Sequence, residues 1–153
     1  MTLRERISAA LKVAMRQKDA TRLSTLRLIS AAIKDQDINA RGNGNADGVD
    51  EAGVLAILGK MVKQRQESAR AYEEGGRLEL AEKERAEVAV IEDFLPRQLD
   101  DTEIEAAISA AMRDTDAGSI RDMGRVMGVL KAKYTGQMDF GAVGPLVKAR
   151  LAT

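Results

Sequence analysis

A proline-centred break between two helical patterns constrains the fold of this chain more than any other feature. Ile91 and Leu95 stand four residues apart, as residues on one face of a helix do. Pro96 disfavours helical backbone at the preceding residue and has no amide hydrogen to donate. Asp100 then stands three residues before Glu103, which is the spacing of a capping box that begins a new helix. The sequence therefore predicts that one helix ends at Leu95 and that two helical units meet at Pro96.

The rest of the chain is also patterned for helices. Its 153 residues include 3% aromatic residues, so the core must be built from aliphatic and Met side chains. This length suits one domain of average size or two small helical ones. We expect an all-α protein in which residues 1–95 form an N-terminal helical bundle and residues 96–153 form a smaller C-terminal three-helix domain.

Apolar spacing, capping residues and glycines give the individual helices. The expected helices cover residues 2–18, 20–40, 50–74, 78–95, 101–113 and 119–133, with a last helix after Asp139 that contains Pro145 near its start. The Asn- and Gly-rich segment Arg41–Gly48 is predicted to be a mobile loop. Six apolar side chains of the later helices are expected to face the cores: Leu80, Ile120, Met123, Met127, Leu130 and Leu146.

Composition and charge limit the chemistry. The chain has no Cys and no His, which removes thiolate chemistry and the commonest general base and metal ligand. No phosphate loop or calcium loop is complete, so we expect no catalytic residues, no cofactor and no metal. Lys and Arg outnumber Asp and Glu by five over residues 1–41, and the reverse holds over residues 77–103. Such segments either meet a polyanion or neutralise each other within the fold.

No stretch is long and apolar enough to span a bilayer, and residues 1–18 alternate charged and apolar side chains instead of forming a signal peptide. We therefore expect a soluble cytoplasmic protein without a membrane partner.

Four separated motifs, in order along the chain, carry a resemblance to a known family. They are Leu26–Lys34, Tyr72–Glu84 with its Gly75-Gly76-Arg77 turn, Asp93–Leu99, and Asp122–Lys131. Over nearly its whole length the chain resembles the GatB/YqeY family, in particular its free-standing YqeY-like members. The resemblance implies an all-helical, two-part fold and a relationship to the tail of the B subunit of the tRNA-dependent amidotransferase. In that enzyme the tail contacts tRNA, and the chemistry resides elsewhere.

The segment Ser119–Lys133 is the best candidate for a binding surface. On a helical wheel its apolar residues point one way, and two small and three cationic residues lie on the side and back: Arg121, Gly124, Arg125, Gly128 and Lys131. Small residues allow a partner's backbone to come close, and cations suit phosphate oxygens. The alternative is that the two glycines permit tight packing of helices and that the charges are merely solvated.

We interpret the chain as a noncatalytic tRNA-interaction module and expect it to assist aminoacyl-tRNA amidation beside an amidotransferase or an aminoacyl-tRNA synthetase, with no DNA partner. Arg4, Lys12 and Arg16 of the basic N-terminal segment offer a rival RNA surface. A second hypothesis is a protein-interaction adaptor for an aminoacylation enzyme. A third is a carbon–nitrogen ligase with glutamine as amide donor, which lacks support from the residues.

Overall fold

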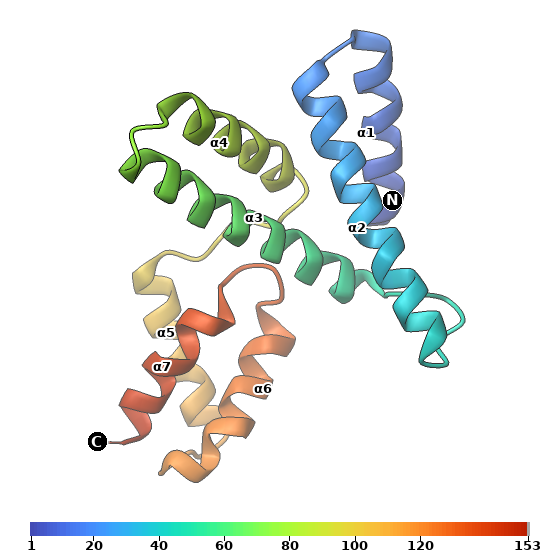
Figure 1. Ribbon diagram of the computed structural model, residues 1–153. Coiled ribbons are helices and arrows are strands. Elements are labelled where there is room, and N and C mark those ends of the chain that lie inside the picture. Colours follow the sequence, from blue (N-terminus) through green and yellow to red (C-terminus); the bar gives the residue numbers. More distant parts are fainter. Residues whose placement is uncertain (153) are drawn as a thin grey trace. The chain divides into compact units, whose positions relative to one another are not determined.

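The computed structural model describes residues 1–152, and these residues form seven α-helices and one short 3-10 turn, without a strand (Figure 1). The first four helices are α1 (Leu3–Gln17), α2 (Ala20–Gly42), α3 (Glu51–Glu74) and α4 (Leu78–Glu92). They are followed by α5 (Asp101–Asp114), the 3-10 turn η1 (Ile120–Asp122), α6 (Met123–Lys133) and α7 (Phe140–Leu151). The predicted all-α class is confirmed.

The chain divides into two compact units, residues 1–95 and residues 96 onward. Each unit has an apolar core of its own. That the two units are independently folding domains stays a prediction.

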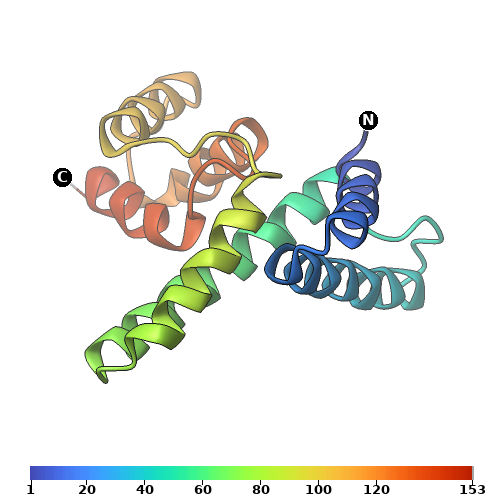
Figure 2. The ribbon, with the colours of Figure 1, turned by 90° about the horizontal axis from the view of Figure 1, so that it is seen from above.

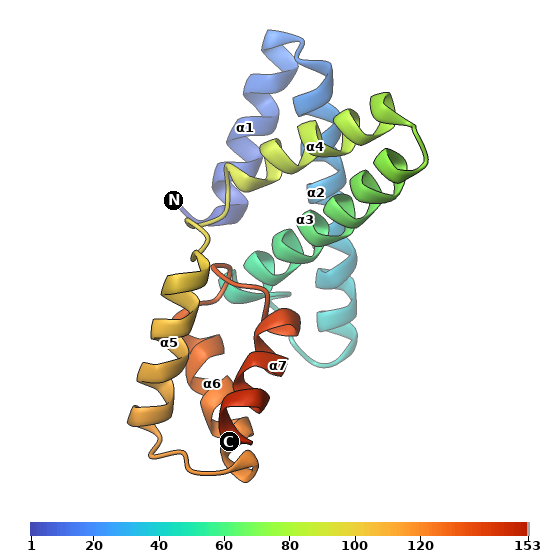
Figure 3. The same cartoon turned by 90° about the vertical axis from the view of Figure 1, so that its left-hand side faces the viewer.

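The N-terminal unit consists of two helical hairpins. α1 lies beside α2, and α3 lies beside α4 (Figures 2 and 3). Its core contains Leu26 and Ile29 of α2, Leu58 of α3 and Ile91 of α4, all of which are fully buried. These side chains recur at the three- and four-residue spacing that places them on the inner face of each helix.

The C-terminal unit places α5, α6 and α7 around a second core. Ile108 of α5, Leu130 of α6 and Val147 of α7 are fully buried there. The predicted capping box begins α5: Asp100 Oδ1 accepts a hydrogen bond of 2.8 Å from the amide of Glu103, and Glu103 Oε1 accepts one of 3.1 Å from the amide of Asp100. Both bonds satisfy amide groups that the first turn of a helix leaves without partners.

Two predicted boundaries are wrong by a few residues. α4 ends at Glu92 instead of Leu95, because the chain turns early to bury the ring of Phe94. The helix predicted from Ser119 is divided into η1 and α6.

The glycine-rich loop begins and ends two residues later than predicted. α2 continues through Gly42 and α3 begins at Glu51, so the connection covers residues 43–50. Residues 43–47 are exposed, whereas Gly48 is buried.

Three apolar side chains predicted to face the cores are exposed: Leu80, Ile120 and Leu146. Leu80 and Leu146 each precede a buried residue of the same helix by one position, which turns them about 100° away from the core. Ile120 lies in η1, where three residues per turn replace 3.6 and the helical wheel no longer applies. Of the residues predicted for α6, Leu130 is buried and Met123 and Met127 are partly buried against the core, whereas Val126 was missed and is fully buried.

Pro145 lies in the middle of α7, beyond the first turn where its presence was expected. Its ring nitrogen cannot donate to the carbonyl of Gly141, one turn earlier. Gly141 is exposed, so water can satisfy that carbonyl and the helix continues to Leu151.

Among residues 1–152, no helix combines the length and the hydropathy that crossing a bilayer requires.

Candidate nucleic-acid interface

The start of α6 is held by one carboxylate. Asp122 accepts hydrogen bonds from the amides of Gly118, at 2.8 Å, and Ser119, at 3.2 Å. The amide of Gly118, then the Arg125 guanidinium one turn later and then the amide of Ser119 lower the pKa of Asp122 to about 2. The carboxylate is therefore charged at neutral pH and fixes the turn from which α6 begins.

The face of α6 that points away from the core collects the predicted site residues. Val126 and Leu130 are fully buried on the inner side. At about 100° per residue, the outer side of α6 then carries Gly124, Arg125, Gly128 and Lys131, and Arg121 lies in η1 directly before the helix. All five predicted residues are exposed. The structure thus brings the predicted residues together on one surface, which we call the α6 outer face.

The two glycines of this face are not explained by packing within the chain. A Cβ atom built on Gly124 or Gly128 would meet no described atom within 4 Å. The alternative that they allow another helix of the chain to pack closely is therefore wrong for the described residues. An exposed glycine inside a helix costs roughly 0.5–1 kcal/mol relative to alanine. The two glycines therefore lower the stability of α6, and no contact with the described residues offsets this loss.

The cations of the α6 outer face differ in whether they form an ion pair within the described residues. Arg125 forms an ion pair with Asp122 on its own helical turn. Within residues 1–152, the side chains of Arg121 and Lys131 have no ion pair or hydrogen bond. Arg121 and Lys131 are thus the cations that can contact a phosphate group without first losing a partner.

Acidic and basic side chains are distributed unevenly over the C-terminal unit. α5 and the residues that flank it, 100–116, carry six carboxylates and one cation, whereas residues 123–151 carry five cations and one carboxylate. Arg150 of α7 donates to Glu105, at 3.3 Å, and to Ser109 Oγ, at 2.8 Å, both on α5. The acidic helix α5 therefore contacts the basic helix α7 through these bonds.

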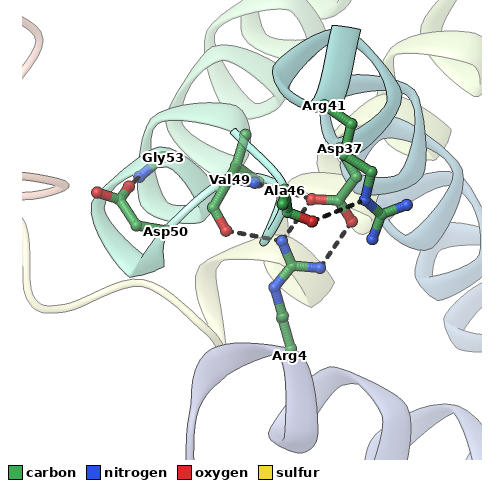
Figure 4. A network of polar contacts seen from close by, with 7 residues as sticks. All are labelled: Arg4, Asp37, Arg41, Ala46, Val49, Asp50 and Gly53. Atoms are coloured by element: carbon green, nitrogen blue, oxygen red, sulfur yellow. Dashed lines mark hydrogen bonds and ion pairs between the residues drawn. The ribbon is translucent and has the colours of Figure 1, made fainter. Parts of the chain in front are cut away.

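The rival N-terminal surface loses one of its three predicted residues. The Arg4 guanidinium binds both carboxylate oxygens of Asp37, at 2.8 and 2.6 Å, and donates to the carbonyl oxygen of Val49 at 2.8 Å (Figure 4). Lys12 and Arg16 are exposed and have no partner among residues 1–152. Arg4 is thus a structural residue, and Lys12 and Arg16 remain available.

Asp37 is a structural residue that the sequence analysis missed. Besides Arg4, its Oδ1 accepts a hydrogen bond of 3.0 Å from the amide of Val49. The Arg4 guanidinium and then this amide hold the pKa of Asp37 well below its usual range. One signal was present in the sequence, because Asp37 continues the four-residue spacing of the buried Ile29 and Ile33.

No group of three or more Asp or Glu side chains within residues 1–152 is placed to hold a metal ion.

Comparison with known proteins identifies relatives over most of the chain. Residues 4–151 match the family described as Yqey-like protein. A protein of Pyrenophora tritici-repentis named "Altered inheritance of mitochondria protein 41, mitochondrial" is 30% identical over 135 residues, which cover 86% of this chain and 71% of that protein.

Proteins of the same name from two yeasts match over shorter segments. The protein of Lachancea thermotolerans is 31% identical over 65% of this chain and 52% of its own length. The protein of Meyerozyma guilliermondii is 39% identical over 56% of this chain and 42% of its own length. The chain thus spans about half the length of these two relatives.

Proposed function

The chain belongs to the YqeY-like protein family, and on this basis we propose that it is a noncatalytic module that binds tRNA through the α6 outer face. The observation that carries the proposal is the combination of two exposed glycines on α6, which have no described neighbour to pack against, with two exposed cations that have no partner within residues 1–152, Arg121 in the turn before α6 and Lys131 near its end. A fold that keeps costly glycines at a basic surface gains from them only when another molecule approaches closely.

The proposed contact is to the sugar–phosphate backbone. Lys and Arg side chains that bind phosphates position a protein on RNA without reading its sequence. Double-stranded RNA is recognised mainly by its shape and by backbone contacts. The α6 outer face has no aromatic side chain on which a base could stack. We therefore propose that it recognises a folded RNA such as tRNA by shape, with little preference for sequence.

The test is the salt dependence of tRNA binding by the wild-type chain and by Arg121→Glu with Lys131→Glu. Each lost phosphate contact removes a hydrogen bond to a charged group, worth about 1.5–3 kcal/mol. Each also reduces the slope of log affinity against log salt by about one. The double variant should therefore bind tRNA more weakly, with a flatter salt dependence and an unchanged circular dichroism spectrum.

A matched control reverses two exposed cations of the N-terminal unit that have no partner within residues 1–152, Lys60→Glu with Lys83→Glu, and should leave tRNA affinity nearly unchanged. If reversal of Lys12 and Arg16 abolishes binding while reversal of Arg121 and Lys131 has no effect, the site has been placed on the wrong unit. If no pair matters, the adaptor hypothesis takes its place.

Association with an aminoacyl-tRNA synthetase or an amidotransferase is part of the same proposal, on the ground of the resemblance to the tail of the amidotransferase B subunit. The noncatalytic part is tested by assaying the purified chain for release of ammonia from glutamine and for hydrolysis of ATP. Turnover that survives purification and is lost in a point variant would restore the ligase hypothesis.

The location of the chain in the cell is also part of the proposal. The sequence predicts the cytoplasm, whereas the names of the fungal relatives refer to mitochondria. Both compartments contain tRNA, so the proposed activity is compatible with either.

A further inference from the structure

A groove with an apolar floor runs between α1 and α2. Ile7 and Leu11 of α1 and Ile33 of α2 line its floor, and its volume is about 210 Å³. Pockets that hold drug-sized ligands have roughly 300–1,000 Å³. The groove is therefore too small for most cofactors and suits a few side chains of a larger partner.

One end of the groove is closed by the ion pair between Arg4 and Asp37. Arg4 binds both oxygens of the Asp37 carboxylate, so this end contributes little net charge. Lys34 also lines the groove, and its ammonium group has no partner within residues 1–152. The unbalanced charge in the groove is therefore positive.

Two further cations extend this positive charge along the groove. Lys12 stands four residues after Ser8, and Arg27 stands three residues before Ser30; both serines line the groove. Residues three or four apart lie on the same side of a helix. Lys12 and Arg27 are exposed and have no partner within residues 1–152, so three free cations follow one groove.

One free carboxylate lies on the groove side. Glu5 stands three residues before Ser8, which lines the groove, so Glu5 lies on the same side of α1 as Lys12. Asp35 follows Lys34 by one position, and a single step along a helix turns a side chain by about 100°. Three cations (Lys12, Arg27 and Lys34) therefore stand against one carboxylate (Glu5), and the charge along the groove stays positive.

An exposed apolar side chain continues the floor. Met15 stands four residues after Leu11 and is 54% exposed. α1 and α2 contain no aromatic residue, so the groove offers no platform for a base. Aliphatic side chains flanked by cations instead match a helix whose apolar stripe is bordered by carboxylates.

We propose that the groove between α1 and α2 binds an acidic amphipathic helix of a partner protein. From Arg4 to Met15 α1 rises about 16 Å, or three turns of a docked helix. Aliphatic side chains of that helix cover the partly exposed Leu11 and the exposed Met15, and its carboxylates face Lys12, Arg27 and Lys34. This surface lies on a different unit from the α6 outer face, so the inference goes beyond the proposed RNA function and does not depend on it.

The probe is a synthetic helical peptide of roughly 18 residues, long enough to form a helix, with Leu at positions i, i+4 and i+7 and Glu on both flanks. Titrated into the isotopically labelled full chain, it should bind saturably and shift amide resonances of α1 and α2. A second peptide with Ala in place of Leu should bind at least about tenfold more weakly, because the apolar contact is removed.

The variant Lys12→Glu, Arg27→Glu, Lys34→Glu should weaken peptide binding about tenfold or more, since each exposed ion pair contributes modestly and all three become repulsive. Lys60→Glu with Lys83→Glu, and Arg121→Glu with Lys131→Glu, should leave peptide affinity unchanged. Circular dichroism checks that every variant is folded.

Three results would overturn the inference. The first is the absence of saturable peptide binding. The second is equal affinity for the Leu and Ala peptides, which would show unspecific attraction between charges. The third is loss of tRNA binding, with peptide binding retained, in the triple variant, which would make the groove an RNA surface.

Discussion

Asp37 is the residue at which three segments of the N-terminal unit meet. Asp37 lies in α2, and its carboxylate binds the guanidinium of Arg4 in α1. The same carboxylate accepts a hydrogen bond from the amide of Val49, just before α3. Within this cluster Arg4 also donates to the Val49 carbonyl, and Leu3 donates its amide to Glu51 at 2.9 Å. These contacts position the start of α1 against the connection between α2 and α3.

Replacing Asp37 by asparagine should lower the free energy of unfolding at pH 7 by about 1–2 kcal/mol, because a charged acceptor is lost while Arg4 stays in place. The folded-state pKa of Asp37 is lowered from an unfolded value of about 3.9. Its contribution is thus complete above about pH 4 and is lost as the pH falls through the lowered folded-state pKa. Urea unfolding at pH 7, 4 and 2.5 should show the two chains converging in acid.

The matched control for this measurement is Asp35→Asn, an exposed position two residues earlier without a partner within residues 1–152. It should change the free energy of unfolding by less than about 0.5 kcal/mol. A difference between wild type and Asp37→Asn that does not depend on pH would show that the ion pair is not the stabilising contact.

Gly48 gives a second prediction at the same cluster. Its φ is +79°, and a Cβ atom there would lie 2.4 Å from Asp37 Oδ1. Gly48→Ala should therefore destabilise the chain by about 2 kcal/mol or more, by combining backbone strain with displacement of the carboxylate. Gly44→Ala isolates the strain, since Gly44 has φ +93° but open space around it. Equal losses in thermal unfolding of the two variants would show that the contact with Asp37 costs nothing.

For single residues, the sequence predicts which side chains are exposed better than it predicts which side chains contact one another. The exposure of Gly124, Arg125, Gly128 and Lys131 follows from helical periodicity, which is a local property. The pairing of Arg4 with Asp37 joins positions 33 residues apart, and no local pattern selects one of the several possible cations. Asp37 on a buried stripe signals that some partner exists without naming it.

α6 combines a stabilising inner face with an outer face that lowers its stability. Gly124→Ala with Gly128→Ala should therefore raise the free energy of unfolding, by about 0.5–1 kcal/mol for each residue, since no neighbour among the described residues meets the added methyl groups. If the face binds tRNA by close approach, the same variant should bind tRNA more weakly. Urea unfolding and a tRNA titration on one preparation give both values.

A gain of stability with unchanged tRNA affinity would remove the glycines from the interface and leave only the cations. A loss of stability would contradict the open surroundings of both positions. Gly59→Ala on α3 is the matched control, because Gly59 also has nothing within 4 Å and lies outside the proposed interface.

The sequence predicts every helix and misses details that depend on tertiary packing. The capping box at Asp100 is local chemistry, and the structure contains it. The early end of α4 follows from burial of Phe94, which only the folded core decides. The 3-10 turn before α6 rotates Ile120 out of the register that an ideal helical wheel assigns to it.

Across the whole molecule the main structural claim is the division at Pro96. Each unit buries its own apolar residues, so we expect residues 1–95 and residues 96–153 to fold when produced separately. Their amide spectra should superpose on the corresponding parts of the full-chain spectrum. The smaller unit should be the less stable of the two, because short chains bury a smaller fraction of their surface. A fragment that stays unfolded would show that the units form one cooperative domain.

The division itself is visible in the sequence because proline chemistry and capping are local. The proposed function could be predicted from the sequence only in part. The proposal of tRNA binding began from the resemblance of the sequence motifs to the tail of an amidotransferase subunit, and helical periodicity selected the exposed residues of α6. The groove between α1 and α2 arises from the pairing of two helices, so neither helix alone predicts it.

The most direct test of the central claim is a titration of the isotopically labelled chain with tRNA, followed by amide resonances at low and at physiological salt. We expect the largest changes at Arg121, Gly124, Arg125, Gly128 and Lys131, and we expect them to weaken as salt rises, since phosphate contacts release counterions. Changes confined to α1 and α2, or no changes at any salt concentration, would contradict the assignment of RNA binding to the α6 outer face.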